Sequence, residues 1–300
     1  MKTYILEGGV GKHVAFTSLI KTLATRDRSP IQIYTPYVEV FANNPYVKLA
    51  LESTSLPLDD ARILESDDIV FVEPYKSTWQ RGQEHVINAY ARLLNIEYTG
   101  EKPELYTDHR KQEVAELKDK INKPFIVVQF NGGQSPTIYQ GGDYHSNNPG
   151  KNYTPYLAQQ LIHKLKKQFP DTEILNWSLP NEPQYDGAQP IDVHYTTMHE
   201  LLKSAAGVIG ADGCLMHLAR SAGKTGVFVW GNTRINQFGY TQNTNLTFHG
   251  DKTYELTDPR NIMVDPDLII EAFAKNHYKN TSLKSVLSAK LGNKKVSFKR

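Results

Sequence analysis

Cysteine is nearly absent from this 300-residue chain, in which Cys214 stands alone. One cysteine excludes a disulfide framework and a metal site built from several thiolates, and it fits a reducing compartment. Long apolar runs are missing too, since no segment reaches the roughly 18 residues that a membrane-spanning helix needs. The first residues enter an apolar run at once, without the basic and apolar regions of a secretion signal. The sequence therefore predicts a cytoplasmic protein.

An excess of one charge sign is also missing. The chain carries 34 Lys or Arg and 32 Asp or Glu, a formal net charge of +2 at pH 7. This balance excludes a polycation that binds nucleic acid along its whole length, so any basic patch must be local. What the chain does have is length and a sufficient apolar content. Both suit two domains of ordinary size, each with its own core.

Short apolar runs alternate with amphipathic stretches, a pattern typical of α/β domains with parallel sheets. Strands are predicted over 3–6, 31–34, 69–73, 125–130, 173–177, 207–210 and 226–230, and helices over 12–25, 84–95, 154–168, 197–206 and 214–222. The charged stretch 108–122 is predicted to connect the halves. We expect Rossmann-like domains over 1–122 and 123–274 that face a cleft, followed by a basic tail over 275–300.

The stretch YILEGGVGKHVAF, residues 4–16, has the strand, glycine cluster and helix order of a phosphate-binding loop. A nucleotide-hydrolysing loop would need a glycine where Leu6 stands and a Ser or Thr where His13 stands, so that interpretation fails. What remains is a turn in which three glycines let a ligand approach the backbone and the amides that open a helix.

A second stretch, residues 205–233, resembles the donor-binding segment of glycosyltransferase family 9, the heptosyltransferase-like family. The positions in register with its motifs are Asp212, Met216, His217, Leu218, Ala219, Gly223, Lys224, Gly231 and Thr233. GKNYTP at 150–155 is similar to the family's Lys-x-Trp-Pro entry to a helix, and NWSLPNEP at 176–183 is similar to its Trp-Gly-x-x-x-Glu motif. The donor turn departs from the family at Gly213 and Cys214.

The resemblance implies the two-domain GT-B architecture and an inverting transfer from a nucleotide-diphosphate sugar, which is a co-substrate, with no metal and no other cofactor. It assigns the donor to Lys151, Glu182, Asp212, Gly213, Cys214, Leu215 and His217. Physical chemistry supports a diphosphate site at these residues, because amides at a helix N-terminus and a lysine both bind phosphate groups. Ordinary structural roles stay open: Asp212 as a helix cap, His217 as a buried core histidine, and Lys151 as a solvated surface residue.

Inverting transfer also needs a base that takes the proton of the acceptor hydroxyl. The candidates are His13, Glu7 and Asp68, with Asp67 and Glu73 as further carboxylates near the strand 69–73. We expect His13 to face the cleft as a neutral imidazole, because Lys12 and the helix N-terminus disfavour its charged form. The competing interpretation buries His13 in the domain core and makes a carboxylate the base.

The first half is expected to bind the acceptor. Lys12 stands where many family members carry the acidic residue proposed as base, so it departs from the family and could neutralise a donor or acceptor phosphate. The predicted acceptor residues are Gly9, Gly11, Lys12, Tyr75, Lys76, Trp79 and Arg81, of which the aromatic and cationic ones suit a sugar or phosphosugar. The same aromatics could instead pack in the core.

The tail from Lys275 to Arg300 has eight Lys or Arg and no acid, with Leu283 and Leu291 among apolar residues at helical spacing. Its basic face would meet a lipid A core, an anionic membrane surface or DNA, or it would be solvated. The sequence thus predicts an inverting glycosyltransferase that acts on a lipopolysaccharide-core-like or other glycan acceptor. Two alternatives stay open: a transferase that modifies hydroxylated DNA bases, and a non-catalytic protein that binds nucleotide sugars. The oligomeric state is left open.

Overall fold

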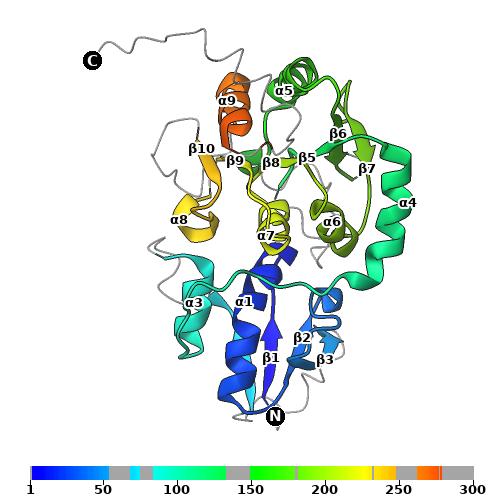
Figure 1. Ribbon diagram of the computed structural model, residues 1–300. Helices are drawn as coiled ribbons and strands as arrows, with labels where there is room; N and C mark the ends of the chain where they lie inside the picture. Colours follow the sequence, from blue (N-terminus) through cyan, green and yellow to red (C-terminus); the bar gives the residue numbers. More distant parts are fainter. Residues whose placement is uncertain are drawn as a thin grey trace.

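The chain forms two parallel β-sheets, one above the other in Figure 1, with helices packed on them. This architecture is seen in a computed structural model that describes residues 2–53, 68–74, 84–132, 149–179, 182–231, 233–247, 262–276 and 278. The predicted α/β class with two Rossmann-like parallel sheets is confirmed.

The N-terminal sheet has the strand order β3-β2-β1-β4. Its strands are β1 (Thr3–Leu6), β2 (Ile31–Thr35), β3 (Val47–Glu52) and β4 (Ile69–Val72), and its helical elements are α1 (Val10–Arg26), η1 (Val38–Val40) and α3 (Val86–Leu93). Helix α1 contacts α3 and β2, and its central residues, such as Phe16 and Leu19, are fully buried. Burial of that apolar surface is what stabilises the helix on its sheet.

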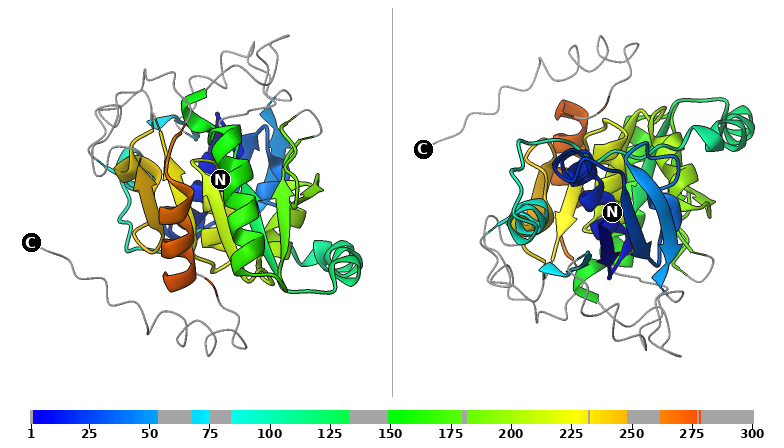
Figure 2. Two further views of the ribbon diagram at one scale, coloured as in Figure 1. Left: turned by 90° about the horizontal axis from the view of Figure 1, so that it is seen from above. Right: turned by 90° about the horizontal axis from the view of Figure 1, so that it is seen from below.

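The C-terminal sheet has the order β10-β9-β8-β5-β6-β7. Its strands are β5 (Phe125–Gln129), β6 (Glu173–Trp177), β7 (Gln189–Ile191), β8 (Gly207–Ala211), β9 (Val227–Trp230) and β10 (Thr244–Thr247). The helical elements of this half are η6 (Pro149–Lys151), α5 (Pro155–Gln168), α6 (Tyr195–Leu202), α7 (Cys214–Ser221), α8 (Ile235–Phe238) and α9 (Pro266–Asn276). Figure 2 shows α5 and α9 side by side over this sheet, in agreement with their mutual contacts.

Helices cover both faces of the C-terminal sheet. Successive residues of a strand point to opposite faces, and in β5 Val127 belongs to the same core cluster as the α6 and α7 residues Met198 and Leu215. Its neighbour Ile126 belongs to the other cluster, which includes Phe273 of α9. Burial on both faces explains why β5 is an unbroken apolar run in the sequence.

One hydrophobic core runs through both halves of the chain. The cluster that contains Val127 and Leu215 also contains Tyr4 of β1, Ile33 of β2 and Phe16 of α1. Contact between α1 and α7 joins the two parts of this cluster. The two sheets are therefore packed together through buried apolar side chains as well as through the chain that connects them.

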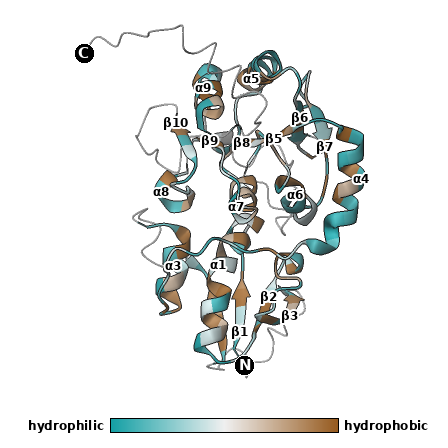
Figure 3. Cartoon of the chain, viewed as in Figure 1, coloured by the Kyte–Doolittle hydropathy of each residue, from teal (hydrophilic) through white to brown (hydrophobic). Residues whose placement is uncertain are grey.

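The connection between the sheets contains its own helix. After η5 (Asp108–Arg110), α4 (Lys111–Ile121) packs on α6, and its C-cap is Asn122, whose φ of 51° is left-handed. Figure 3 shows α4 as largely hydrophilic, and its buried residues are Val114 and Ile121. The predicted role of 108–122 as the link between the halves agrees with its place in the chain, whereas the domain boundaries themselves stay a prediction.

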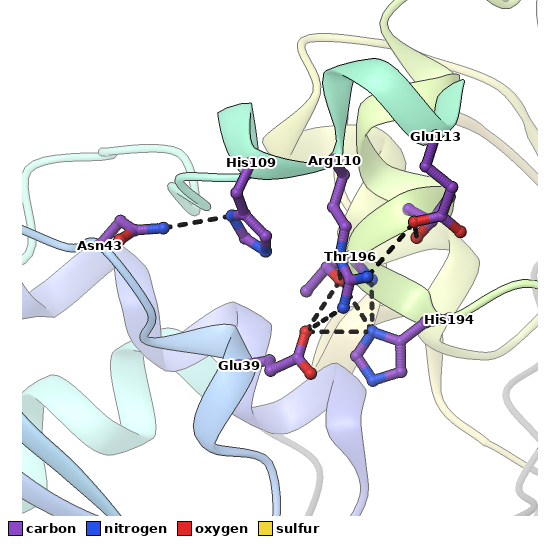
Figure 4. A network of polar contacts seen from close by, with 8 residues as sticks. Glu39, Asn43, His109, Arg110, Glu113, His194 and Thr196 are labelled. Atoms are coloured by element: carbon purple, nitrogen blue, oxygen red, sulfur yellow. Dashed lines mark hydrogen bonds and ion pairs between the residues drawn. The ribbon is translucent and has the colours of Figure 1, made fainter. Parts of the chain in front are cut away.

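A network of charged and polar side chains also joins the halves (Figure 4). Glu39 of η1 lies 2.6 Å from Nη2 of Arg110 and 3.5 Å from Nδ1 of His194, the residue before α6. Thr196 of α6 donates a hydrogen bond to Glu39, at 3.2 Å, and accepts one from Arg110, at 3.1 Å. Arg110 also pairs with Glu113 of α4, at 3.3 Å. The network thus connects η1, the linking segment and α6.

Candidate functional site

Each sheet has a point at which the strand order reverses. The candidate site is made of residues from both of these points. In the N-terminal sheet the chain runs from β1 to β2 and β3 on one side and then returns to β4 on the other. In the C-terminal sheet it runs from β5 to β6 and β7 and then returns to β8. Ligands of open α/β sheets bind at the carboxyl ends of the strands at such reversals.

Lys12 and Glu73 lie at the reversal of the N-terminal sheet. Lys12 is in the first turn of α1, just after β1, and Glu73 directly follows β4. The Lys12 Nζ atom is 3.8 Å from Oε1 of Glu73, and the two side chains are 10% and 20% exposed. Burial lowers the pKa of Lys12 to about 8, Glu73 opposes this shift, and the positive charge of Lys151 adds to it. Lys12 and Lys151, which come from different sheets, are therefore close enough to repel each other.

Lys151 and Asp212 lie at the reversal of the C-terminal sheet. The Lys151 Nζ atom is 3.1 Å from Oδ2 of Asp212, which is almost fully buried directly after β8. The turn is tight, because a Cβ atom on Gly132, which follows β5, would lie only 2.2 Å from the Asp212 carbonyl oxygen. The Gly132 amide donates to the side-chain oxygen of Asn152, at 3.1 Å. These contacts fix Gly132 against the turn after β8.

Helix α7 begins in this turn without a side-chain cap. Its N-cap is Gly213, which has no side chain that could accept from the first amides, and its first turn has no acidic residue. Glu182 lies near this turn, since its carboxylate adds to the rise that burial causes in the pKa of the Cys214 thiol, to about 12. One Glu182 oxygen accepts from the Leu179 amide, at 3.0 Å. Free amides at the start of a helix are a suitable seat for an anion.

The first turns of α1 and α7 touch each other. A Cβ atom on Gly11 would lie 2.7 Å from Cδ2 of His217 and 3.4 Å from the Cα of Cys214. Like α7, α1 has a glycine N-cap without a side-chain hydrogen bond, and its first turn has no acidic residue. Two helix N-termini, each with the positive end of its dipole, therefore meet where the two lysines lie.

The overall fold of the chain is similar to that of solved glycosyltransferases. No family model matches the sequence, and no curated protein matches it. The structure resembles a glycosyl transferase of family 9 from Veillonella parvula, with 11% identity, a TM-score of 0.66, and 91% of this chain and 95% of that chain covered. It also resembles the E. coli ADP-heptose LPS heptosyltransferase II, with 13% identity and a TM-score of 0.64, and with 91% of this chain and 98% of that chain covered. For the E. coli heptosyltransferase WaaC with ADP, the identity is 12% and the TM-score is 0.56, and 92% of this chain and 98% of that chain are covered.

The chain has the heptosyltransferase fold. At 11–13% identity the likeness concerns the fold, and it extends over nine tenths of the chain. The architecture that the motif at 205–233 implied is thereby confirmed, including its two Rossmann-like sheets.

His13 lies in the core of this heptosyltransferase fold, so the expectation that it faces a cleft is wrong. The residue is fully buried, with Nδ1 at 3.0 Å from the Gly9 carbonyl oxygen and Nε2 at 3.4 Å from that of Leu6. Its ring packs edge-on against Tyr37, with 4.9 Å between ring centroids. Burial lowers its pKa to about 4, so the imidazole is neutral as expected, but mainly because of desolvation and only to a small extent because of Lys12. The competing interpretation placed it correctly.

Asp68 is also misplaced for the predicted role of base. It precedes β4, and its carbonyl oxygen accepts from the amide of Thr3 at the start of β1. Because β4 separates it from Glu73, the two lie about 16 Å apart along the strand. Glu7, by contrast, is exposed at the carboxyl end of β1 and acts electrostatically on Lys12. Among the three predicted bases, only Glu7 lies exposed at the edge where the two sheets meet.

The other predicted residues fall into three groups. Gly9 is the N-cap of α1 and has open space where a Cβ would be, whereas Gly11 packs against α7, and the contact of both with an acceptor stays a prediction. Leu215 and His217 are buried, and His217 pairs with the Tyr240 hydroxyl at 2.8 Å, so their donor roles stay predictions. Four predicted acceptor residues lie outside the described residues: Tyr75, Lys76, Trp79 and Arg81.

Two aromatic residues near the site were not predicted. The Lys151 Nζ atom lies 5.8 Å from the centre of the Phe238 ring, within the range of a cation–π interaction, and Tyr240 holds His217. Both rings come from the segment just after β9, the strand next to β8. Their position after a predicted strand was the available signal, but their contact with Lys151 and His217 depends on the fold.

Two structural findings concern the described residues as a whole. In this part of the chain no helix is long and apolar enough to cross a membrane. The same residues contain no group of three or more His, Cys, Asp or Glu side chains arranged to hold a metal ion.

Proposed function

We propose that the protein is a glycosyltransferase that takes a sugar from a nucleotide-diphosphate donor and transfers it to a hydroxyl group of an acceptor, with inversion and without a metal ion. The observation that carries this proposal is the Lys151–Asp212 pair in front of the uncapped start of α7. It supplies a cation and the amides that open a helix at the reversal point of a sheet, where a diphosphate has complementary partners.

The same groups favour the chemistry of transfer. When the bond between the sugar and the diphosphate breaks, negative charge develops on the departing phosphate oxygens. Lys151 and the first amides of α7 are fixed beforehand by Asp212 and by the contact with Gly132, so they stabilise this charge with little rearrangement. Glu182 lies close to the same turn, and its carboxylate can accept a hydrogen bond that a ribose hydroxyl donates.

Glu7 is the base that we propose for the acceptor hydroxyl. It is exposed at the carboxyl end of β1, next to the start of α1, whereas His13 is buried and Asp68 lies at the opposite edge of the sheet. For the acceptor we propose a glycan or phosphosugar of the lipopolysaccharide-core type, because one structural neighbour is an LPS heptosyltransferase. Contact of the basic tail with a membrane surface or with modified DNA stays a prediction, since residues 279–300 lie outside the described residues.

Calorimetry with ADP, UDP, GDP and CDP tests the donor site. One of these nucleotides should bind, with ADP the first choice because a neighbour of this fold was solved with it. Lys151→Ala should weaken that binding by roughly 1.5–3 kcal/mol, the usual contribution of a hydrogen bond to a charged group. Lys164→Ala is the matched control, since Lys164 is on the outer side of α5 and pairs there with Asp267. No binding of any nucleotide, or equal binding by Lys151→Ala, would contradict the proposal.

A second candidate function is a protein that binds nucleotide sugars without transferring them. It is favoured by the placement of His13 and Asp68, because two of the three predicted bases are unable to reach an acceptor at the junction of the sheets. Release of the nucleoside diphosphate from a bound nucleotide sugar separates the two functions. Turnover supports the transferase, whereas tight binding of the intact nucleotide sugar without any turnover supports the binding protein.

A further inference from the structure

We propose that both sheets bind the donor diphosphate together, with Lys12 of the first half contacting the same phosphates as Lys151. This inference rests on the proposed function and deepens it. The sequence analysis grouped Lys12 with the acceptor residues and left a contact with a donor phosphate open, and the structure gives reasons to favour the donor.

The two lysines occupy equivalent places in the two sheets. Lys12 pairs with Glu73 where the order of the N-terminal sheet reverses, and Lys151 pairs with Asp212 where that of the C-terminal sheet reverses. Each lysine stands beside the first turn of a helix without a side-chain cap, α1 in one case and α7 in the other. Each half thus presents the same anion-binding elements toward the junction.

The halves present these elements to one another at short range. Gly11 of α1 packs against Cys214 and His217 of α7, so that the two first turns are in contact. A ligand placed at one helix N-terminus is therefore close to the other as well. A diphosphate is suited to this place, since its two phosphate groups can each take a lysine and a set of amides.

Lys12 is held in a fixed orientation. Its side chain folds over Gly8, whose φ of 95° needs glycine, and a Cβ atom there would lie 2.8 Å from the Lys12 Nζ atom. Only a tenth of the side chain is exposed, and burial together with the charge of Lys151 disfavours its protonated form. An anion between the two lysines would relieve this repulsion and favour the proton on Lys12.

Proton uptake on binding is the measurement that tests this inference. At pH 8 the nucleoside diphosphates are fully ionised, whereas Lys12, with a pKa of about 8, is about half protonated. Calorimetry in two buffers of different ionisation enthalpy, with the tightest binder among ADP, UDP, GDP and CDP, should show uptake of about half a proton per nucleotide. Binding should then weaken as the pH rises from 7 to 9.

Two variants of Lys12 separate charge from titration. Lys12→Gln should lower the affinity roughly 10- to 150-fold and abolish the proton uptake, because it removes a charged hydrogen bond and the titrating group. Lys12→Arg keeps the positive charge but does not titrate in this range, so it should retain most of the affinity and still lose the proton uptake. The Arg variant keeps the inference testable if the Gln variant does not fold.

The outcomes distinguish this inference from the proposed function. If wild-type protein binds a nucleotide, Lys151→Ala weakens that binding, and both Lys12 variants match the wild type in affinity and proton uptake, Lys12 belongs to the acceptor side and the inference is overturned. If the wild-type protein binds none of the four nucleotides, the proposed function itself fails.

Discussion

Among the residues that the structure describes, three histidines are buried as neutral side chains. Burial lowers the pKa of His13 and of His199 to about 4, and that of His217 to about 3. Each is held in its place by nearby groups: His13 by two carbonyl oxygens, His199 by Thr107 at 2.8 Å, and His217 by Tyr240. Charging any of them in the folded state would leave a cation in an apolar environment.

These histidines predict a loss of stability in acid. In the unfolded chain a histidine has a pKa of about 6.5, so between about pH 4 and 6.5 the unfolded state binds more protons than the folded one. The free energy of unfolding therefore decreases as the pH falls through this window. His13→Gln should reduce the decrease between pH 7 and pH 5 by about 2 kcal/mol, at 1.36 kcal/mol per pKa unit.

Urea unfolding at pH 5 and pH 7 measures this effect. His163→Gln is the control, because His163 is exposed on α5 and pairs with the exposed Asp186. An equal pH dependence in wild-type protein and His13→Gln would show that His13 does not contribute to acid sensitivity.

Individual site residues were predictable where their chemistry is local. Lys151 and Asp212 were both predicted from a motif, and the structure brings them to 3.1 Å. The burial of His13 was not predictable from its place in a glycine turn. Positions 11 and 13 lie on opposite sides of α1, and only the packing of Tyr37 and Phe41 decides that the side with His13 is covered. Repulsion between Lys12 and Lys151 likewise depends on how the two sheets meet.

At the scale of elements, every central strand was predicted, whereas three of the four edge strands were missed and the edge strand β4 was found. The predicted strands β1, β2, β4, β5, β6, β8 and β9 are all present. The three that sequence patterns missed are β3, β7 and β10, which lie at sheet edges. Edge strands are covered on fewer sides, so they need fewer apolar residues: β10 is Thr-Asn-Leu-Thr, and β7 is three residues with a proline.

Helix ends followed local signals only in part. Helix α6 ends at Leu202, four residues before the predicted end, because the chain turns at Lys203 and Ser204 and starts β8 at Gly207. Helix α1 begins two residues before the predicted start, at Val10 after the N-cap Gly9. That difference matters for the site, because it brings Gly11 and Lys12 into the first turn of the helix.

The contact between α1 and α7 predicts a strong effect of a small substitution. Gly11→Ala would place a methyl group 2.7 Å from the buried His217 ring, so it should destabilise the fold by about 1–3 kcal/mol, the usual effect of overpacking. It should also weaken nucleotide binding, because it moves the two first turns apart.

Gly9→Ala is the matched control for this element. Gly9 lies two residues earlier, its φ of −76° suits any residue, and nothing lies within 4 Å of the added Cβ. The loss of a glycine N-cap should cost less than about 1 kcal/mol. Equal urea midpoints for the two variants would contradict the proposed packing of α1 on α7.

At the scale of the whole molecule, the two sheets depend on each other. The core cluster that contains Tyr4 and Phe16 continues into the C-terminal half through Leu215, Met216 and Val127. The network of Glu39, Arg110, His194 and Thr196 adds partly exposed polar contacts, which contribute little where they are solvated. The shared core is therefore the main reason for the halves to hold together.

A shared core predicts that both halves unfold in one step. Scanning calorimetry should give a single transition whose van't Hoff enthalpy equals the calorimetric enthalpy. Glu39→Gln, which removes an exposed ion pair, should lower the midpoint only slightly and keep the single transition. Two separate transitions in the wild-type protein would show that each half is stable without the other.

The contact of Gly11 with Cys214 also determines how late in synthesis the start of α1 can be covered. The two residues are 203 positions apart (214 − 11), so at 5–20 residues per second the ribosome needs about 10–40 s to make the second after the first. During that interval the start of α1, with Gly11 and its apolar neighbours, has no α7 to cover it. The contact between these two first turns therefore forms only after residue 214 has been made, and until then a chaperone has an apolar surface to cover.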